Sequence, residues 1–246
     1  MLNEEKIRRA LGYDLPLTCL AVTDSTNLRL KEICRSGDHR PRLLCADAQT
    51  AGRGRLGRTF LSPEQTGIYM SLLLPLPQDD LPLTVRAAAA VCRAVEEVCG
   101  LHLLVKWVND LFLHGKKVCG ILAEGADHMA VLGIGVNVRM PENGFPDVPI
   151  AGALNTDADR ETLIGRIAFH VLETLSENKN SILSLYRARM LLMNKNITFN
   201  QSGQEKQGRV LGVDDTGGLI VETKNGTEIL RTGEVSIGSS QLACLE

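Results

Sequence analysis

Residues 103–138 read LLVKWVNDLFLHGKKVCGILAEGADHMAVLGIGVNV, and this stretch decides the class of fold. Apolar runs of strand length alternate here with turn residues, at His114 and Gly115 and again at 126–128. Strands joined by such tight turns pair antiparallel with their neighbours in the chain. We therefore predict an antiparallel sheet in this region rather than a winding of alternating strands and helices.

Helices and further strands flank this stretch on both sides. Residues 81–98 are rich in alanine and valine at helical spacing, which predicts a long and largely buried helix. Other apolar patterns predict helices at residues 3–11, 24–36, 159–177 and 181–193, and strands at residues 15–22, 42–46 and 67–74. Together these elements predict an α+β domain in which helices pack on a mixed sheet.

The pattern of apolar and turn residues changes after Asn194. Short β-rich runs separated by glycine turns are found at residues 197–199, 208–213, 218–222, 228–231 and 234–237. About 50 residues with five short strands are typical of an SH3-like β-barrel. We therefore predict two domains, residues 1–193 and residues 194–246.

Composition excludes several classes of protein. The 246 residues carry 27 basic and 29 acidic side chains, a net charge of −2, which argues against a general binder of nucleic acid or membrane surfaces. The seven cysteines occur singly and without C-x-x-C spacing, as expected of buried thiols in a reducing compartment. We find no cleaved leader and no stretch of about 18 apolar residues, and we predict a soluble, cytoplasmic protein.

Residues 47–66 show no apolar period, and a loop of this length in a compact domain is usually functional. The loop contains GRGRLGR at residues 52–58, which matches the dinucleotide-binding pattern G-x-G-x-x-G. No helix follows it, because residues 59–64 lack a helical period and include Pro63. Three arginines between glycines can instead enclose an anion. The alternative is a solvated basic loop, such as an RNA-binding segment.

Two further segments carry polar groups at strand ends. A hairpin over residues 105–124 would bring Lys117 near Asn109 and Asp110. The alternative is a strand-end turn with a core tryptophan at Trp107 and a solvated pair of lysines. In residues 131–138, two glycines leave room for a ligand to approach the strand that holds Asn137. Here the alternative is an asparagine whose side chain closes a bulge.

Four segments taken together resemble the biotin-protein ligase family. They are DSTN at 24–27, GRGRLGR at 52–58, KWVND at 106–110 with KVCGILAE at 117–124, and GIGVN at 133–137. The resemblance spans about residues 17–237. It implies a class II synthetase-like catalytic domain at residues 1–193, of the kind shared by biotin and lipoate ligases, and an SH3-like domain at 194–246. Because only about sixteen residues precede the first strand, we expect the short form that lacks an N-terminal DNA-binding domain.

The resemblance also implies roles for individual residues. Biotin would contact Ser25, Thr26, Asn27, Gln49, Gly52, Arg53, Gly54, Arg55, Lys117, Gly120, Gly133 and Gly135. The nucleotide would contact Arg55, Arg58, Trp107, Asn109, Lys117 and Asn137. Catalysis would involve Arg55, Arg58, Asp110 and Lys117, with Asp110 organising Mg²⁺.

The activity implied by the resemblance has two steps. Biotin and ATP, with Mg²⁺, would give biotinyl-5'-AMP and pyrophosphate, and biotin would then pass to a lysine of a biotin carboxyl carrier protein or domain with release of AMP. We expect no DNA or membrane partner, and a monomer or homodimer. A DNA-binding repressor, a lipoate ligase and a vitamin-storage protein are the alternatives. The length of the chain disfavours a DNA-binding repressor. The pattern of arginines and glycines disfavours a lipoate ligase. The number of cations suited to bind phosphate disfavours a vitamin-storage protein.

Three residues depart from the family pattern. Val108 stands where proline is usual, Phe60 where tryptophan is common, and Cys119 where a small residue is common. None of these changes removes a charged group. A thiol beside the ligand at Cys119 would make the protein sensitive to alkylation.

Overall fold

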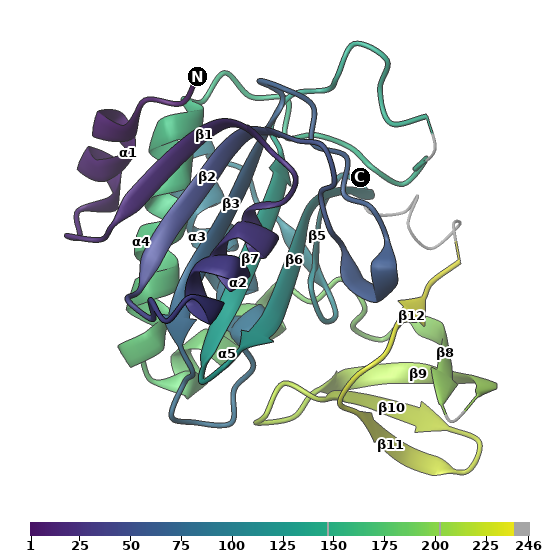
Figure 1. Ribbon diagram of the computed structural model, residues 1–246. Helices are drawn as coiled ribbons and strands as arrows, with labels where there is room; N and C mark the ends of the chain where they lie inside the picture. Colours follow the sequence, from purple (N-terminus) through teal and green to yellow (C-terminus); the bar gives the residue numbers. More distant parts are fainter. Residues whose placement is uncertain (147, 202, 239–246) are drawn as a thin grey trace.

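The computed structural model describes residues 1–146, 148–201 and 203–238 (Figure 1). The larger sheet has seven strands in the order β1-β2-β3-β7-β6-β5-β4. Their bounds are β1 (Leu17–Thr23), β2 (Arg42–Gln49), β3 (Gly67–Pro75), β4 (Leu104–Lys106), β5 (Asp110–Leu113), β6 (Lys116–Ala126) and β7 (Met129–Asn137). The helices are α1 (Glu4–Leu11), α2 (Thr26–Arg35), α3 (Leu83–Cys99), α4 (Arg160–Ser176) and α5 (Lys179–Ala188).

The predicted hairpins at residues 103–138 are confirmed. β4, β5, β6 and β7 pair antiparallel in chain order, and the two tight turns place His114 and Asp127 at positive φ. Among the described strands of this sheet, β1 and β2 form the one parallel pair, and α2 provides the crossover between them. The sheet is therefore mixed, as predicted.

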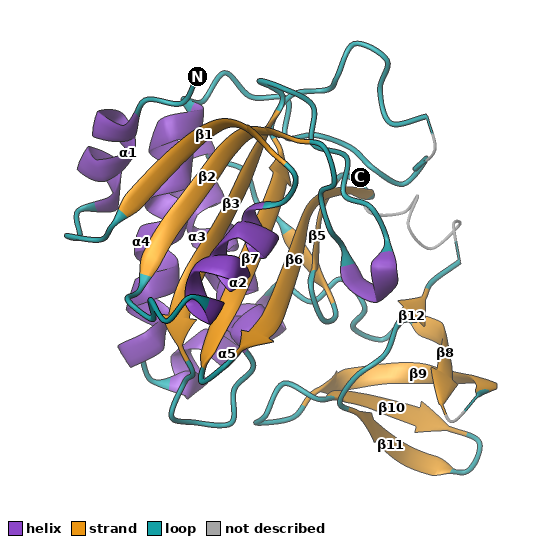
Figure 2. Cartoon of the chain, in the orientation of Figure 1, coloured by secondary structure: helices purple, strands orange, loops and turns teal. Residues whose placement is uncertain are grey.

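Helices cover both faces of the sheet (Figure 2). α3 and α4 pack together on one face, while α2 lies on the other face against β2, β3 and β7. Because β3 is covered on both sides, all of its residues except Pro75 are buried, which explains its nearly unbroken apolar sequence. The short side chains of 87–90 let α3 lie close to the sheet, and all four are buried.

The helix predicted at 181–193 begins and ends earlier than expected. α5 ends at Ala188, because the chain beyond it pairs with the edge strand β4. The amide of Val105 donates to the carbonyl of Arg189 at 2.7 Å, and the amide of Leu191 donates to the carbonyl of Val105 at 2.9 Å. These hydrogen bonds give partners to the backbone amide and carbonyl of Val105, which would otherwise be unpaired at the edge of the sheet.

A second, five-stranded antiparallel sheet follows. It comprises β8 (Asn196–Gln201), β9 (Gln204–Val213), β10 (Leu219–Thr223), β11 (Gly226–Leu230) and β12 (Val235–Ser236). The strand order is β11-β10-β9-β8-β12, and within the described residues the two edge strands are not hydrogen-bonded to each other. The five short strands are present as predicted, and within the described residues their sheet is open, with only two residues in the edge strand β12. The division of the chain at 193/194 stays a prediction.

Within the described ranges, no helix is both long enough and apolar enough to cross a lipid bilayer.

Candidate functional site

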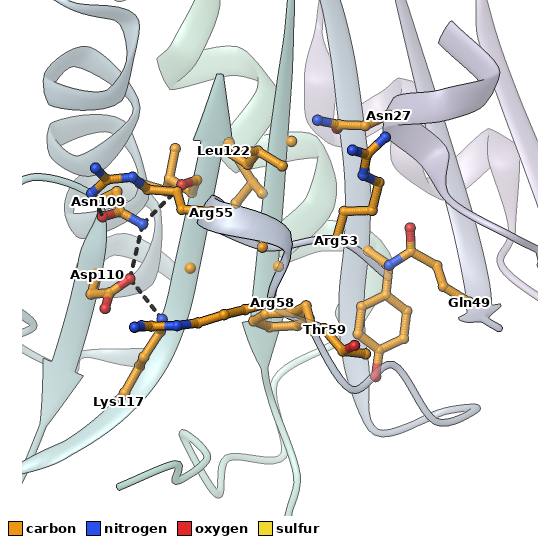
Figure 3. A pocket seen from close by; sticks show the side chains of 18 of the residues that line it. Asn27, Gln49, Arg53, Arg55, Arg58, Thr59, Asn109, Asp110, Lys117 and Leu122 are labelled. Carbon is orange, nitrogen blue, oxygen red and sulfur yellow. Dashed lines mark hydrogen bonds and ion pairs between the residues drawn. The ribbon is translucent and has the colours of Figure 1, made fainter. Parts of the chain in front are cut away.

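A cavity of about 500 Å³ lies between the loop at residues 50–66, which we call the arginine loop, and the strands β5, β6 and β7 (Figure 3). The start of α2 closes one end of the cavity, and residues 148–150 and Glu234 contribute to its rim. The predicted site residues that line it are Ser25, Thr26, Asn27, Gln49, Arg53, Gly54, Arg55, Arg58, Asn109, Asp110, Lys117, Gly120, Gly133 and Gly135. Segments far apart in the sequence thus meet in one place.

The end of the cavity next to α2 is a fixed polar network. Gln49 Oε1 accepts hydrogen bonds from the amide and the hydroxyl of Thr26, at 2.9 and 3.2 Å, and Gln49 Nε2 donates to Ser62 Oγ at 2.9 Å. The hydroxyl of Ser71 lies 2.6 Å from Asn27 Oδ1, and Asn27 Nδ2 donates to Glu124 Oε2 at 2.9 Å. Such a network holds its amides and hydroxyls in defined directions, which suits recognition of a polar ring.

Glu124 is the charged member of this network. It also pairs with Lys31 at 3.0 Å. Burial raises the pKa of Glu124, but the hydrogen bonds from Asn27 and Lys31 outweigh burial, so the pKa lies below its ordinary value. The carboxylate therefore stays ionised and accepts hydrogen bonds at neutral pH. Neither Ser71 nor Glu124 was among the site residues predicted from the sequence.

Glycines form the floor of the cavity because larger residues would not fit. Gly120 of β6 lies opposite Gly135 of β7, and the ring of Phe60 from the arginine loop packs on both. A Cβ at Gly135 would lie 2.6 Å from that ring, and one at Gly133 would lie 2.2 Å from Asn27 Oδ1. These glycines accommodate neighbouring side chains of the site, in addition to any ligand.

The other end of the cavity is cationic. Four basic residues gather there around two carboxylates, Asp110 and Glu234; the basic residues are Arg55, Arg58, Lys106 and Lys117. A fifth basic residue of the lining, Arg53, lies at the other end beside Asn27 (Figure 3). Lys117 Nζ lies 2.7 Å from Asp110 Oδ1, and Asn109 Nδ2 donates to the same oxygen at 3.0 Å (Figure 3). This excess of positive charge in a partly enclosed space favours a polyanion.

The turn between β11 and β12 reaches the arginine loop. Arg55 donates from Nη1 to Asn109 Oδ1 at 2.9 Å and from Nη2 to the carbonyl of Gly233 at 2.8 Å. Arg58 Nη2 donates to Glu234 Oε2 at 2.6 Å. Sequence analysis missed Gly233 and Glu234, because no local pattern signals a contact between residues about 176 positions apart in the chain.

Lys106 and the apolar lining were also missed. Burial lowers the pKa of Lys106, which is consistent with a lysine that turns toward the cavity instead of bulk solvent. Leu122 could have been found from the sequence, because the two-residue period of a strand places it on the face of Gly120. The apolar residues of the lining are Phe60, Met70, Phe112, Ile121, Leu122, Ile134, Val148 and Ile150.

Three predicted site residues lie outside the cavity. Gly52 is buried where a Cβ would approach the carbonyl oxygen of Phe60 to 2.3 Å, so it allows the arginine loop to fold back on itself. Trp107 is buried, and its indole nitrogen donates to the carbonyl of Gly217, in the turn between β9 and β10, at 2.9 Å. Asn137 Nδ2 donates to the carbonyl of Gly152 at 2.8 Å and so holds the segment that follows the rim.

The expectation for Cys119 is wrong. Its side chain is fully buried in the core under the sheet, on the face opposite to Gly120. Burial raises the pKa of this thiol well above its ordinary value, which further lowers its reactivity. Val108, the second departure, follows a cis peptide bond from Trp107.

Family models match both parts of the chain. The model described as the biotin/lipoate A/B protein ligase family matches residues 19–138, and the model described as the biotin protein ligase C terminal domain matches residues 192–238. The second match confirms the SH3-like fold of the C-terminal sheet. The arginine loop and the strands of the cavity all fall within the first match.

Individual proteins are similar over nearly the whole chain. The chain is 32% identical to the bifunctional ligase/repressor BirA of Bacillus subtilis over 96% of this chain and 79% of that protein. It is 32% identical to the biotin--[acetyl-CoA-carboxylase] ligase of Mycobacterium tuberculosis over 95% of this chain and 93% of that protein. The structure of the biotin protein ligase from Aquifex aeolicus in complex with biotin and ATP superposes with a TM-score of 0.77 at 30% identity, covering 91% of this chain and 98% of that one.

Proposed function

Because the chain belongs to the biotin/lipoate A/B protein ligase family, we propose that it is a biotin-protein ligase that activates biotin with ATP and transfers it to a carrier protein. One observation carries this proposal. A single cavity joins a polar end, an apolar and glycine-floored middle and a cationic end. These three regions of the cavity, in this order, match a molecule with a polar ring, an aliphatic chain and a carboxylate that must meet a nucleotide phosphate.

The network at the start of α2 supports a place for the ring of biotin. Ser25, Thr26, Asn27 and Gln49 would contact the ureido group, whose carbonyl and N–H groups need both donors and acceptors. The aliphatic chain would run along the ring of Phe60, which packs on Gly120 and Gly135, and past Leu122. Its carboxylate would then lie near Lys117 and Arg55.

The first step brings two anions together. A carboxylate oxygen of biotin attacks the α-phosphorus of ATP, the bond from that phosphorus to the bridging oxygen breaks, and pyrophosphate leaves. Lys117, Arg55 and Arg58 offset the repulsion between the two groups and stabilise the charge that develops on phosphate. For this purpose Arg58 must exchange its contact with Glu234 for the phosphates.

Asp110 is suited to assist a Mg²⁺ ion. Mg²⁺ that accompanies ATP is held mainly by phosphate oxygens and water, with one or two carboxylates from the protein. Asp110 lines the cavity beside Lys117 and is one of two carboxylates among the cations there, which fits that requirement. The ion would neutralise charge on the phosphates.

In the second step the neutral amine of an acceptor lysine attacks the acyl carbon of biotinyl-5'-AMP. The bond from that carbon to the phosphate oxygen breaks, AMP leaves, and the attacking nitrogen loses a proton. The arginine loop would keep water from the mixed anhydride until the acceptor arrives. A carrier protein or domain that presents a single exposed lysine is the partner that this reaction requires.

Several finer expectations stay predictions. They are nucleotide contacts by Trp107 and Asn137, the location in the cytoplasm, the absence of a DNA partner, and the choice between monomer and homodimer. Ligand contacts by Gly52, Trp107 and Asn137 also stay predictions, because these three residues lie outside the cavity and contact neighbouring segments of the chain.

The proposal is tested by transfer to an acceptor. The protein is incubated with ATP, Mg²⁺ and a biotin carrier domain, with either biotin or lipoate as the acid. We expect the carrier to gain the mass of one biotinyl group on one lysine, with one AMP released per transfer. Transfer of lipoate in preference to biotin, or no transfer by folded protein, would overturn the assignment.

A further inference from the structure

A second cluster of chemically active side chains lies at the far end of α2 from the cavity. Cys34 is in the last turn of α2, His39 follows in the loop toward β2, and Asp127 is in the turn between β6 and β7 (Figure 1). Within the described ranges, this is the one group of histidine, cysteine and acidic residues whose ligand atoms converge closely enough to hold a metal ion.

The ligand atoms already have nearly the spacing of a tetrahedral site. Asp127 Oδ2 lies 3.8 Å from Cys34 Sγ and 3.4 Å from His39 Nε2, and all three atoms lie within 4.8 Å of one another. Metal bonds of about 2.0–2.3 Å at tetrahedral angles separate the ligand atoms by roughly 3.3–3.8 Å. The two distances to Asp127 already fall in this range, and the cysteine and histidine atoms lie within 4.8 Å of each other.

Burial differs among the three residues in a way that suits a bound ion. The Cys34 side chain is fully buried, whereas the side chains of His39 and Asp127 are 33% and 51% exposed. The ring of His128 lies against that of His39, with 4.3 Å between ring centroids, and limits the orientations of the imidazole. The buried sulfur is therefore held in a fixed position, and an ion can approach it from the solvent side.

We propose that Cys34, His39 and Asp127 form a Zn²⁺ site. The ligands are the thiolate of Cys34, Nε2 of His39 and a carboxylate oxygen of Asp127, and a water molecule completes the tetrahedron on the exposed side. The thiol releases its proton to solvent when the sulfur binds. A set of one sulfur, one nitrogen and one oxygen favours zinc over magnesium or calcium, which take oxygen ligands.

Binding would connect two elements that support the catalytic cavity. α2 begins with the residues that close the polar end, and β6 and β7 provide the glycine floor. An ion held by the folded chain and not by the unfolded chain stabilises the fold in proportion to its affinity. None of the three ligands lines the cavity, so zinc binding can be tested apart from the proposed ligase reaction.

Cobalt provides the direct test, because Co²⁺ replaces Zn²⁺ and its thiolate complexes absorb in the near ultraviolet. Reduced full-length protein is titrated with Co²⁺ and then with Zn²⁺ while the spectrum is recorded. We expect one equivalent of Co²⁺ to produce a thiolate charge-transfer band that Zn²⁺ abolishes. Zn²⁺ should also raise the unfolding temperature of the protein.

Two variants and one control complete the test. Cys34→Ser should abolish the charge-transfer band. His39→Asn, which alters a loop residue and does not threaten the core, should weaken Zn²⁺ binding more than about tenfold. His102→Asn is the matched control, since His102 and Glu96 form another pair with 3.4 Å between nitrogen and oxygen, outside the cluster. Cobalt binding without a thiolate band, or unchanged Zn²⁺ affinity in folded His39→Asn protein, would refute the site.

Discussion

Lys117 Nζ lies 2.7 Å from Asp110 Oδ1, across the hairpin of β5 and β6, because the pairing of the two strands is irregular at this point. Leu111 pairs with Cys119 and the next residue, Phe112, pairs with Lys117, so β6 contains one extra residue. Such a bulge turns the residues on its two sides toward opposite faces of the sheet. Lys117 therefore faces the cavity together with Gly120, while Cys119 faces the core.

The orientation of Lys117 leads to the first prediction. Lys117→Met should lower the rate of pyrophosphate release about 10²–10³-fold, because the variant lacks a fixed cation where charge develops on the phosphate. The rate is measured with saturating biotin and ATP in the absence of acceptor. Lys116→Met is the control, since Lys116 is exposed and donates to the carbonyl of Pro149. Equal losses in the two variants would exclude a specific role for Lys117.

Arg55 should retain the activated intermediate. Arg55→Gly loses two hydrogen bonds, to Asn109 and to Gly233, that hold the arginine loop over the cavity. Charged hydrogen bonds contribute about 1.5–3 kcal/mol each, so the two together contribute about 3–6 kcal/mol, and we expect release of biotinyl-5'-AMP to be about 10²–10⁴-fold faster.

Labelling of an unrelated protein measures this release. Bovine albumin added to the reaction should become biotinylated on many lysines with Arg55→Gly and not with the parent protein. Arg139→Gly, in the exposed loop after β7, is the control. If acceptor selectivity is unchanged and no free adenylate is found, Arg55 does not retain the intermediate.

The glycine floor should not tolerate a methyl group. Gly133→Ala places a Cβ 2.2 Å from Asn27 Oδ1, so either the strand or the amide must move. Overpacking of this kind costs about 1–3 kcal/mol, and displacement of Asn27 should also weaken biotin binding. Calorimetric titration with biotin and thermal unfolding measure the two effects.

A second glycine provides the control for this variant. Gly125 of β6 has open space around the position of a Cβ, so Gly125→Ala should leave both binding and stability nearly unchanged. Normal biotin affinity in Gly133→Ala would show that Asn27 does not depend on this close contact.

Glu124 should make stability depend on acid pH. Its folded-state pKa lies below the ordinary value of 4.5, so the ionised carboxylate stabilises the fold above that value. This contribution is lost as the pH falls from about 4.5 through the lower folded-state pKa. Glu124→Gln should therefore lose stability less steeply below about pH 4.5 than the parent protein, as measured by urea unfolding at a series of pH values. The exposed Glu222→Gln should follow the parent, and parallel curves for Glu124→Gln would contradict the linkage.

Sequence reasoning succeeded where chemistry depends on local pattern. The tight turns between residues 103 and 138 predicted the hairpins, and these hairpins bring Lys117 to Asp110. The glycines and arginines of 52–58 predicted a loop that encloses a charged cavity. Both inferences rest on residues close to one another in the chain, whose backbone preferences limit the possible structures.

Predictions from the sequence failed where a position depends on contacts between residues far apart in the chain, or on a shift of one residue in the pairing of two strands. The contact between Arg58 and Glu234 joins the arginine loop to the turn before β12, and no periodicity in the sequence predicts it. The bulge beside Lys117 reverses the face of one strand, so the position of Cys119 could not be read from alternation alone. The SH3-like fold of the C-terminal strands was predicted, but five short strands do not reveal whether the two edges of their sheet meet.

Pyrophosphate release from ATP and Mg²⁺ in the absence of any acceptor tests the central claim most directly. The account predicts a burst of pyrophosphate that requires biotin, is not supported by lipoate, and approaches one equivalent per protein because the adenylate stays bound. Release that ignores biotin, or that proceeds equally with lipoate, would contradict the claim that this cavity joins biotin to a nucleotide.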